Sequence, residues 1–215
     1  MYKILAVGDG FACGHIWPMW PNIIESLTED TEVINLGKVG AGNEFIFNST
    51  LDYIYNNDVD YVLIQWASSN RLDMIIDTDD KQKLVDSCPN YSTNTHVVDN
   101  NKWWLSSASK TVDNIIGLKQ SKIRTRNYIL ALESILEKLS IPYSFFSTYK
   151  CDVYPNKNIN WNKWLDVKGM EHYSKQERFL ETRLNEVQPS TYVQTQFVLE
   201  YMNKLPFKWK KNDIQ

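Results

Sequence analysis

Residues 7–14 are VGDGFACG, and this glycine-rich stretch follows directly on the apolar run from Tyr2 to Val7. The run is short, apolar and partly β-branched, which predicts a buried strand. Glycine permits the tight turn that must follow such a strand. Because open α/β sheets commonly place the active-site loop at the carboxyl end of a strand, residues 7–14 indicate both a fold class and the position of a site.

The rest of the chain alternates strand and helix patterns. Three more apolar runs predict buried strands, and four longer stretches with apolar residues at helical spacing predict helices. The predicted strands are Tyr2 to Val7, Glu32 to Leu36, Tyr61 to Gln65 and Pro142 to Phe146, and the predicted helices are Pro21 to Leu27, Asn43 to Tyr55, Arg124 to Leu139 and Thr191 to Leu205. This alternation predicts a three-layer α/β/α sandwich, of the flavodoxin-like kind, around a central and mostly parallel sheet.

Two of the predicted helices carry a clear apolar stripe. In the helix over 124–139 the stripe places Glu133 on a face expected to point to solvent, and its apolar members are Ile129, Leu132, Leu136 and Leu139. The last helix has a start signal at Ser190, and its stripe is Val193, Phe197, Tyr201 and Leu205. Both stripes are typical of helices that cover a sheet.

The length of 215 residues and the even pattern predict one domain, 1–215. From about 72 to 123 the pattern loosens into polar residues around Trp103 and Trp104, and this stretch is too long for a simple connection. We therefore expect an insertion over the edge of the sheet. Residues 206–215 carry a small basic cluster, which predicts a solvated tail.

Composition excludes several classes of function. A net charge of −3 gives no electrostatic reason to bind nucleic acid. The three cysteines, Cys13, Cys88 and Cys151, are too few and too far apart for a disulfide framework or a zinc site, and we expect no metal or other cofactor. No stretch is typical of a signal peptide or a membrane span, so we expect a chain that folds in a cytoplasm and does not bind membranes.

Two further glycine-rich or polar loops follow the next two predicted strands. Residues 35–43 are NLGKVGAGN and residues 65–71 are QWASSNR. Together with residues 7–14, and in this order at the ends of successive strands, they resemble the conserved blocks of the SGNH (GDSL-like) hydrolase family. The resemblance covers most of the chain and implies that Gly40 and Asn70 are its oxyanion-stabilising residues. The layout of residues 123–125 and 141–146 is similar, more narrowly, to SGNH-type proteins of bacteriophages and marine viruses.

The catalytic positions of that family are substituted here. The nucleophilic serine that follows Gly-Asp is replaced by Gly10, and the terminal Asp-x-x-His block is matched by Asn185 and Gln188. Acyl transfer needs an activated nucleophile and a base that can take its proton near neutral pH, and Gln188 cannot titrate there. The resemblance therefore implies an esterase scaffold without an intact catalytic triad, which argues against ordinary enzymatic activity.

The remaining groups suggest recognition. The Gly40 backbone N–H and the Asn70 amide could bind a carbonyl oxygen, and we expect Asp9, Trp66 and Ser69 around the same pocket. The first hypothesis is a pseudo-esterase that binds an acylated glycan or another ester. Two alternatives stay open: a structural or interaction protein of a virion or against a host target, and an active carbohydrate esterase or deacetylase with relocated groups such as Cys13, His15 or His172.

Overall fold

The computed structural model describes residues 1–13, 17–77, 94–98, 102–108, 117–147, 153, 157–165 and 190–210. For residues 72, 74–77, 94–98 and 102–108 it describes the backbone alone. The predicted site residues Asn185 and Gln188, and the histidines His15 and His172, lie outside the described residues.

The centre of the molecule is a four-stranded parallel sheet. Its strands are β1 (Tyr2–Val7), β2 (Thr31–Asn35), β3 (Tyr61–Trp66) and β7 (Tyr143–Ser147). The order across the sheet is β2-β1-β3-β7, and every neighbouring pair is parallel. The four predicted strands are thus confirmed to within a residue at each end, because continuous apolar runs are typical of parallel strands buried on both faces.

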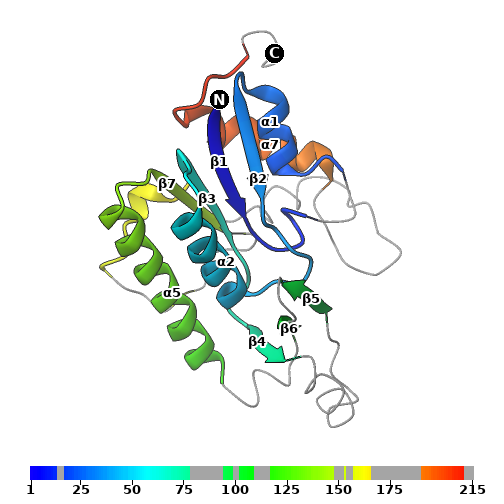
Figure 1. Cartoon of the computed structure of the whole chain (residues 1–215), viewed down its shortest axis with the longest axis vertical. Helices are drawn as coiled ribbons and strands as arrows, with labels where there is room; N and C mark the ends of the chain where they lie inside the picture. The colour runs from blue at the N-terminus through cyan, green and yellow to red at the C-terminus, as the bar shows by residue number, and fades with distance from the viewer. Residues whose placement is uncertain are drawn as a thin grey trace.

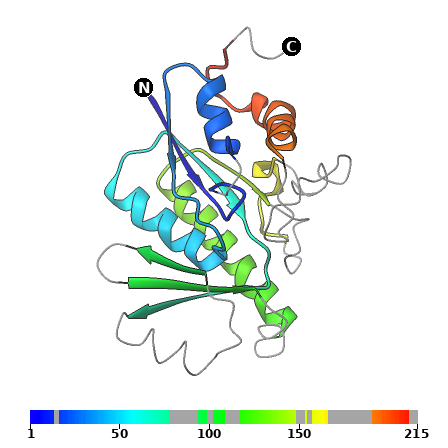
Figure 2. The same ribbon diagram turned by 90° about the vertical axis from the view of Figure 1, so that its right-hand side faces the viewer.

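Within the described residues, two helices cover each face of this sheet. Helices α2 (Asn43–Asn56) and α5 (Leu118–Lys138) pack on one face, and α1 (Trp20–Leu27) and α7 (Thr191–Tyr201) pack on the other (Figures 1 and 2). Each face has its own apolar core, one containing Leu5 and Leu132 and the other Ile4 and Phe197. The predicted three-layer α/β/α architecture is confirmed.

The range predicted as an insertion contains a second sheet. Strands β4 (Arg71–Asp77), β5 (Asn94–Val98) and β6 (Lys102–Ala108) form a three-stranded antiparallel sheet in the order β4-β6-β5. Figure 2 shows this sheet beside the ends of α2 and α5. Helix α5 begins at Leu118, six residues before the predicted start.

Two expectations about helix α5 are wrong. Leu139 is 42% exposed because the helix ends at Lys138 and the chain then turns through Ser140, which has a φ of 57°. Glu133 is buried rather than exposed, since a short segment with the helical turn η1 (Trp161–Lys163) lies over that face of the helix. The apolar stripe itself is buried as predicted at Ile129, Leu132 and Leu136.

The expected solvated tail is packed against the protein as far as Lys210. After α7 and the helical turn η2 (Met202–Lys204), the chain buries Phe207 among the residues of the α1–α7 face. The backbone of Lys208 and Lys210 then makes hydrogen bonds to Glu29 and Leu27. The exposed Lys208 side chain pairs with Glu29, the Lys210 ammonium donates to the Ser26 carbonyl, and the backbone that carries both closes one end of the fold. In the part of the chain that is described, no helix is both long and apolar enough to cross a membrane.

Candidate functional site at the carboxyl edge of the sheet

The loops after β1, β2 and β3 meet at one edge, because these strands are parallel neighbours. The Asn35 side chain donates to the Ala12 carbonyl at 2.8 Å and accepts from the Gly37 N–H at 2.9 Å. A Cβ on Gly37 would lie 2.7 Å from the Ala12 Cβ, so only glycine allows this approach. The loop that contains Gly10 and the loop that contains Gly40 are therefore held against each other.

Asp9 lies beneath these loops and is fully buried. Its Oδ1 accepts hydrogen bonds from the Phe11 N–H at 3.0 Å and from the Gln65 amide at 2.9 Å. Its Oδ2 lies 3.6 Å from the Arg71 guanidinium. The sequence predicted Asp9 at the pocket, and the structure places its carboxylate inside the protein as a support for the loop. It organises the site rather than facing a ligand.

The hydrogen bonds that hold Asp9 continue across the sheet to the face covered by α1 and α7. Gln65 accepts from the Trp20 indole N–H at 2.7 Å, and the Trp20 backbone N–H donates to the Gln194 side chain at 2.7 Å. Gln65, Trp20 and Gln194 are all fully buried, so these bonds are shielded from water. A Cβ on Gly8 would lie 2.8 Å from the Gln65 oxygen, which explains a glycine at that position.

Arg71 joins all three loops, and the sequence did not assign it a role. Its guanidinium faces Asp9 from the first loop and donates to the Ala41 carbonyl of the second at 3.0 Å. Its own carbonyl, at the start of β4, accepts from the Arg124 side chain at 3.0 Å. The sequence feature that could have pointed to Arg71 is its position directly after Asn70. Its partners lie far away in the sequence, so local spacing does not reveal them.

The N-terminus of helix α2 is filled by a carboxylate of this chain. Asp73 Oδ1 accepts from the Gly42 N–H and Oδ2 accepts from the Phe45 N–H, both at 2.8 Å. A Cβ on Gly42 would lie 2.6 Å from Asp73 Oδ2, so this close approach requires glycine. The helix dipole is thus satisfied internally, and these two N–H groups are not offered to a ligand.

Asn43 fixes the third loop. Its side-chain oxygen accepts from the Ala67 N–H at 2.8 Å, and its amide donates to the Ala67 carbonyl at 3.1 Å and to the Thr125 hydroxyl at 3.1 Å. Because Ala67 directly follows β3, this buried pair of bonds sets where residues 68–70 leave the sheet. The position of Asn70 therefore depends on helix α2.

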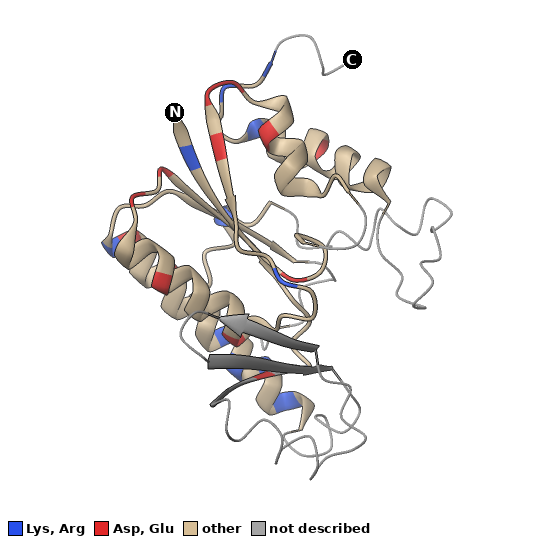
Figure 3. Cartoon of the chain, turned by 45° about the vertical axis from the view of Figure 1, so that its right-hand side comes forward, with Lys and Arg blue, Asp and Glu red and all other residues tan. Residues whose placement is uncertain are grey.

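The charges beside the edge are mixed in sign. Burial raises the pKa of Glu44, and the Asp73 charge adds to the rise, while a hydrogen bond with Tyr128 and the Arg124 charge oppose it. Burial, followed by the Glu44 charge, raises the pKa of Tyr128 to about 12. Figure 3 likewise shows both signs of charge along α5.

Gly40 and Asn70 differ from these neighbours because their polar groups are uncommitted. Gly40 has a φ of 80° and is half-buried, and Asn70 is half-buried in the turn after β3. Among the residues the structure describes, neither the Gly40 N–H nor the Asn70 amide makes a hydrogen bond. Their chain neighbours Ala41 and Arg71 are bonded to each other, which brings the two loops together. Ser69 lies in the same turn and is 8% exposed.

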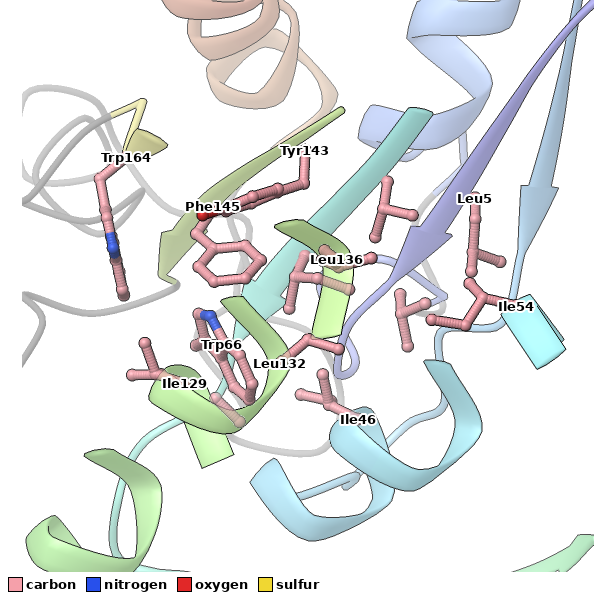
Figure 4. Packing of buried hydrophobic residues seen from close by; sticks show 14 of the residues in the cluster. Leu5, Ile46, Ile54, Trp66, Ile129, Leu132, Leu136, Tyr143, Phe145 and Trp164 are labelled. Carbon is pink, nitrogen blue, oxygen red and sulfur yellow. The ribbon is translucent and has the colours of Figure 1, made fainter. Parts of the chain in front are cut away.

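Trp66 is not at the pocket, in contrast to the prediction. It is 1% exposed and packs edge-on against Phe145 with ring centroids 5.5 Å apart. Figure 4 shows it among Ile129, Leu132 and Phe145, on the α2–α5 face. Successive residues of a strand point to opposite faces, so Gln65 supports the loops from one face while Trp66 fills the core on the other.

Gly10, at the position where the sequence comparison expects a nucleophile, carries no side chain. Gly10 is buried in a turn in which the Ala12 N–H donates to the Asp9 carbonyl at 2.9 Å. Cys13 lies at the end of this turn with its thiol exposed. In the described ranges no three His, Cys, Asp or Glu side chains gather in a way that could hold a metal ion.

Solved structures with a similar chain course include lipolytic proteins and esterases. They include a member of the lipolytic G-D-S-L family from Veillonella parvula, with 12% identity, 95% of this chain and 100% of that chain covered, and a TM-score of 0.41. No family model matches the chain, and no curated protein matches its sequence.

Two further structures are somewhat more similar in course. A lipase/acylhydrolase from Enterococcus faecalis has 14% identity, with 98% of this chain and 100% of that chain covered and a TM-score of 0.49. An acetylxylan esterase from Geobacillus stearothermophilus, solved as a catalytic mutant, has 12% identity, coverage of 98% and 97%, and a TM-score of 0.49. At such values the chemistry of this chain has to be understood from its own residues.

Proposed function

We propose that this chain is an SGNH-type scaffold that binds an ester or another carbonyl ligand, such as an acylated glycan, without the ordinary esterase reaction. One observation carries the proposal: the two groups expected to stabilise an oxyanion, the Gly40 N–H and the Asn70 amide, are uncommitted within the described residues. The polar side chains around them are bonded within the protein, as Asn43 and Asp73 illustrate. Half-buried donors that bond no protein group at such an edge are open to the oxygen of a ligand.

The reaction expected of a complete site is unsupported at its first step. Gly10 offers no atom to attack an ester, and Asp9 is held by Gln65, Phe11 and Arg71. Binding of a carbonyl oxygen by two donors needs neither a nucleophile nor a base. The proposal therefore separates recognition, for which groups are present, from turnover, for which the nucleophile is absent.

The test combines binding and turnover on one sample. Acetylated mono- and oligosaccharides and aryl acetates are titrated into the protein by calorimetry, and p-nitrophenyl acetate reports hydrolysis. We expect binding with no hydrolysis at an ordinary enzymatic rate. Asn70→Ala should weaken binding about tenfold, the worth of one buried hydrogen bond. Asn48→Ala is the matched control, since that side chain bonds only within helix α2, to the Glu44 carbonyl.

Two outcomes would contradict the proposal: no member of the panel binds, or the wild-type protein hydrolyses one of them at an enzymatic rate. Loss of such hydrolysis on His15→Ala or His172→Ala would favour the alternative of relocated catalytic groups. Conversely, Gly10→Ser combined with Asn185→Asp and Gln188→His should create weak esterase activity if the scaffold remains competent.

A second candidate is an interaction protein, encoded by a phage and acting in a virion or on a host target. The observation in its favour is Trp17, which is 78% exposed and follows the loop of Gly10. Exposed tryptophan is enriched where proteins bind one another. A monomeric protein that is absent from particles and recovers no partner would count against this candidate, as would unchanged association of Trp17→Ala.

A further inference from the structure

Arg71 is the one side chain described here that contacts the loops of both proposed carbonyl donors and the loop beneath them. It follows Asn70 directly, donates to the carbonyl of Ala41, which follows Gly40, and faces the buried carboxylate of Asp9. Its side chain is 17% exposed, so most of the guanidinium is removed from water. Such an arrangement fixes the spacing between two loops that no backbone ladder connects.

We propose that Arg71 is a positioning residue, which sets the Gly40 N–H and the Asn70 amide at the separation needed to hold one carbonyl oxygen. The inference rests on the proposed function for the identity of the ligand, while the positioning itself concerns the ligand-free protein. Arg71 reaches each donor through an adjacent residue and does not need to touch the ligand.

The geometry requires the planar fork of arginine. One guanidinium nitrogen, Nη1, bonds the Ala41 carbonyl at 3.0 Å, and the other, Nη2, lies 3.6 Å from Asp9 Oδ2. Lysine would keep the charge but has a single nitrogen, which cannot occupy both positions at once. Asp9 in turn is oriented by Gln65 and the Phe11 N–H, so the carboxylate that Arg71 faces is itself fixed.

The other end of Arg71 connects this arrangement to the second sheet. The Arg71 carbonyl accepts from Arg124 of α5, and two residues further along β4 the Asp73 carboxylate holds the start of helix α2. The first and third residues of β4 therefore hold the chain just after Gly40, through Ala41 and through Gly42. A purely surface ion pair would have none of these backbone partners.

The experiment uses Arg71→Lys in the full chain, with Arg126→Lys as the control because the Arg126 guanidinium bonds its neighbour Asn127 on the exposed side of α5. The first readout is the NMR signal of the Gly40 N–H and of the Asn70 side-chain amide without ligand. The second is the affinity for the acetylated sugars and aryl acetates, measured in the wild-type and the Asn70→Ala backgrounds.

We expect Arg71→Lys to displace both NMR signals and to weaken binding about tenfold in the wild-type background, with a much smaller effect when Asn70 is already alanine. A purely structural role would weaken binding equally in both backgrounds. Arg126→Lys should change neither readout. Unchanged signals and unchanged affinity in Arg71→Lys would overturn the inference.

The experiment also covers two other cases, a variant that does not fold and a wild-type protein that binds no probe. If Arg71→Lys does not fold, Asp9→Asn retains the arginine and removes the charge that orients it, and it should displace the same two signals. If the wild-type protein binds none of the probes, the proposed function fails, and the NMR signals alone decide whether Arg71 positions the two groups.

Discussion

Two buried carboxylates of this protein have opposite surroundings. Asp9 is fully buried and is met by the Phe11 N–H, the Gln65 amide and the Arg71 guanidinium. Glu133 is 4% exposed, and the hydrogen bond it accepts is from the Asn160 N–H at 3.4 Å. Within the described part of the chain Oε1 of Glu133 has no hydrogen-bond partner; Oδ2 of Asp9 accepts no hydrogen bond either, but it faces the Arg71 guanidinium at 3.6 Å. Burial of a carboxyl group alone therefore does not indicate a functional site. Its hydrogen-bond and charge partners decide whether the folded protein favours the charged form.

The two carboxyl groups also differ in what offsets the free-energy cost of their burial. Burial raises the pKa of Glu133 to about 7, the Glu137 charge adds to the rise, and the Asn160 N–H opposes it. Glu133 can thus leave water as a neutral acid. Asp9 instead accepts two hydrogen bonds at Oδ1 and faces a guanidinium at Oδ2. The carboxylate at the edge that carries the proposed site accordingly has more polar partners than Glu133.

The largest effect on stability is expected when the Asp9 carboxyl group, which faces the Arg71 guanidinium, is removed. Asp9→Ala leaves the guanidinium of Arg71 facing an empty position and deprives Gln65 of its acceptor. We expect a loss of about 3–5 kcal/mol in the free energy of unfolding, the usual cost of breaking a buried ion pair. Urea unfolding measures it. Asp9→Asn, which still accepts hydrogen bonds, should cost clearly less, and an Asp9→Ala protein as stable as wild type would show that the two regions do not differ.

A smaller effect on stability is expected at Gln65, which donates a hydrogen bond to Asp9. Gln65→Leu removes the acceptor of the Trp20 indole N–H and a donor to Asp9, both of them buried. The expected loss is about 2–3 kcal/mol, since each group left unsatisfied costs about 1–3 kcal/mol. Gln120→Leu on the exposed side of α5 serves as the control and should change stability by less than about 0.5 kcal/mol. Equal losses of stability in Gln65→Leu and Gln120→Leu would contradict the contribution assigned to the buried hydrogen bonds of Gln65.

The smallest effect, of opposite sign, is expected at Glu133. The folded state holds its proton up to a pKa of about 7, above the ordinary value of 4.5, so the wild-type protein loses stability as the pH rises through this window. Glu133→Gln should remove that loss, raising the free energy of unfolding by about 2 kcal/mol at about pH 8 and by little below about pH 4.5.

Denaturant unfolding across this pH range provides the measurement for Glu133→Gln. Glu200→Gln is the control, because that exposed side chain lies on α7, away from the segment that covers Glu133. The same pH dependence in wild type and Glu133→Gln would assign the effect to another group.

The order of loops in the sequence was enough to predict which of them meet at one edge of the sheet. Gly40 and Asn70 were predicted from the blocks that follow successive strands, and in the structure they lie at one edge with uncommitted donors. Arg71 was not predicted, because its partners Asp9 and Ala41 lie 62 and 30 positions away and sequence spacing carries no signal for such a meeting. Asp73 was missed for the same reason.

What the sequence by itself determined is the four strands of the central sheet, the helices that cover it and the presence of glycine at position 10, since apolar periodicity and residue identity are local properties. What only the tertiary structure decided is which face each polar or aromatic residue meets. Trp66 was expected at the pocket and fills the core, and Glu133 was expected in solvent and lies under the segment around Asn160. Both outcomes depend on which distant segment covers a given face, and that is settled only when the layers pack.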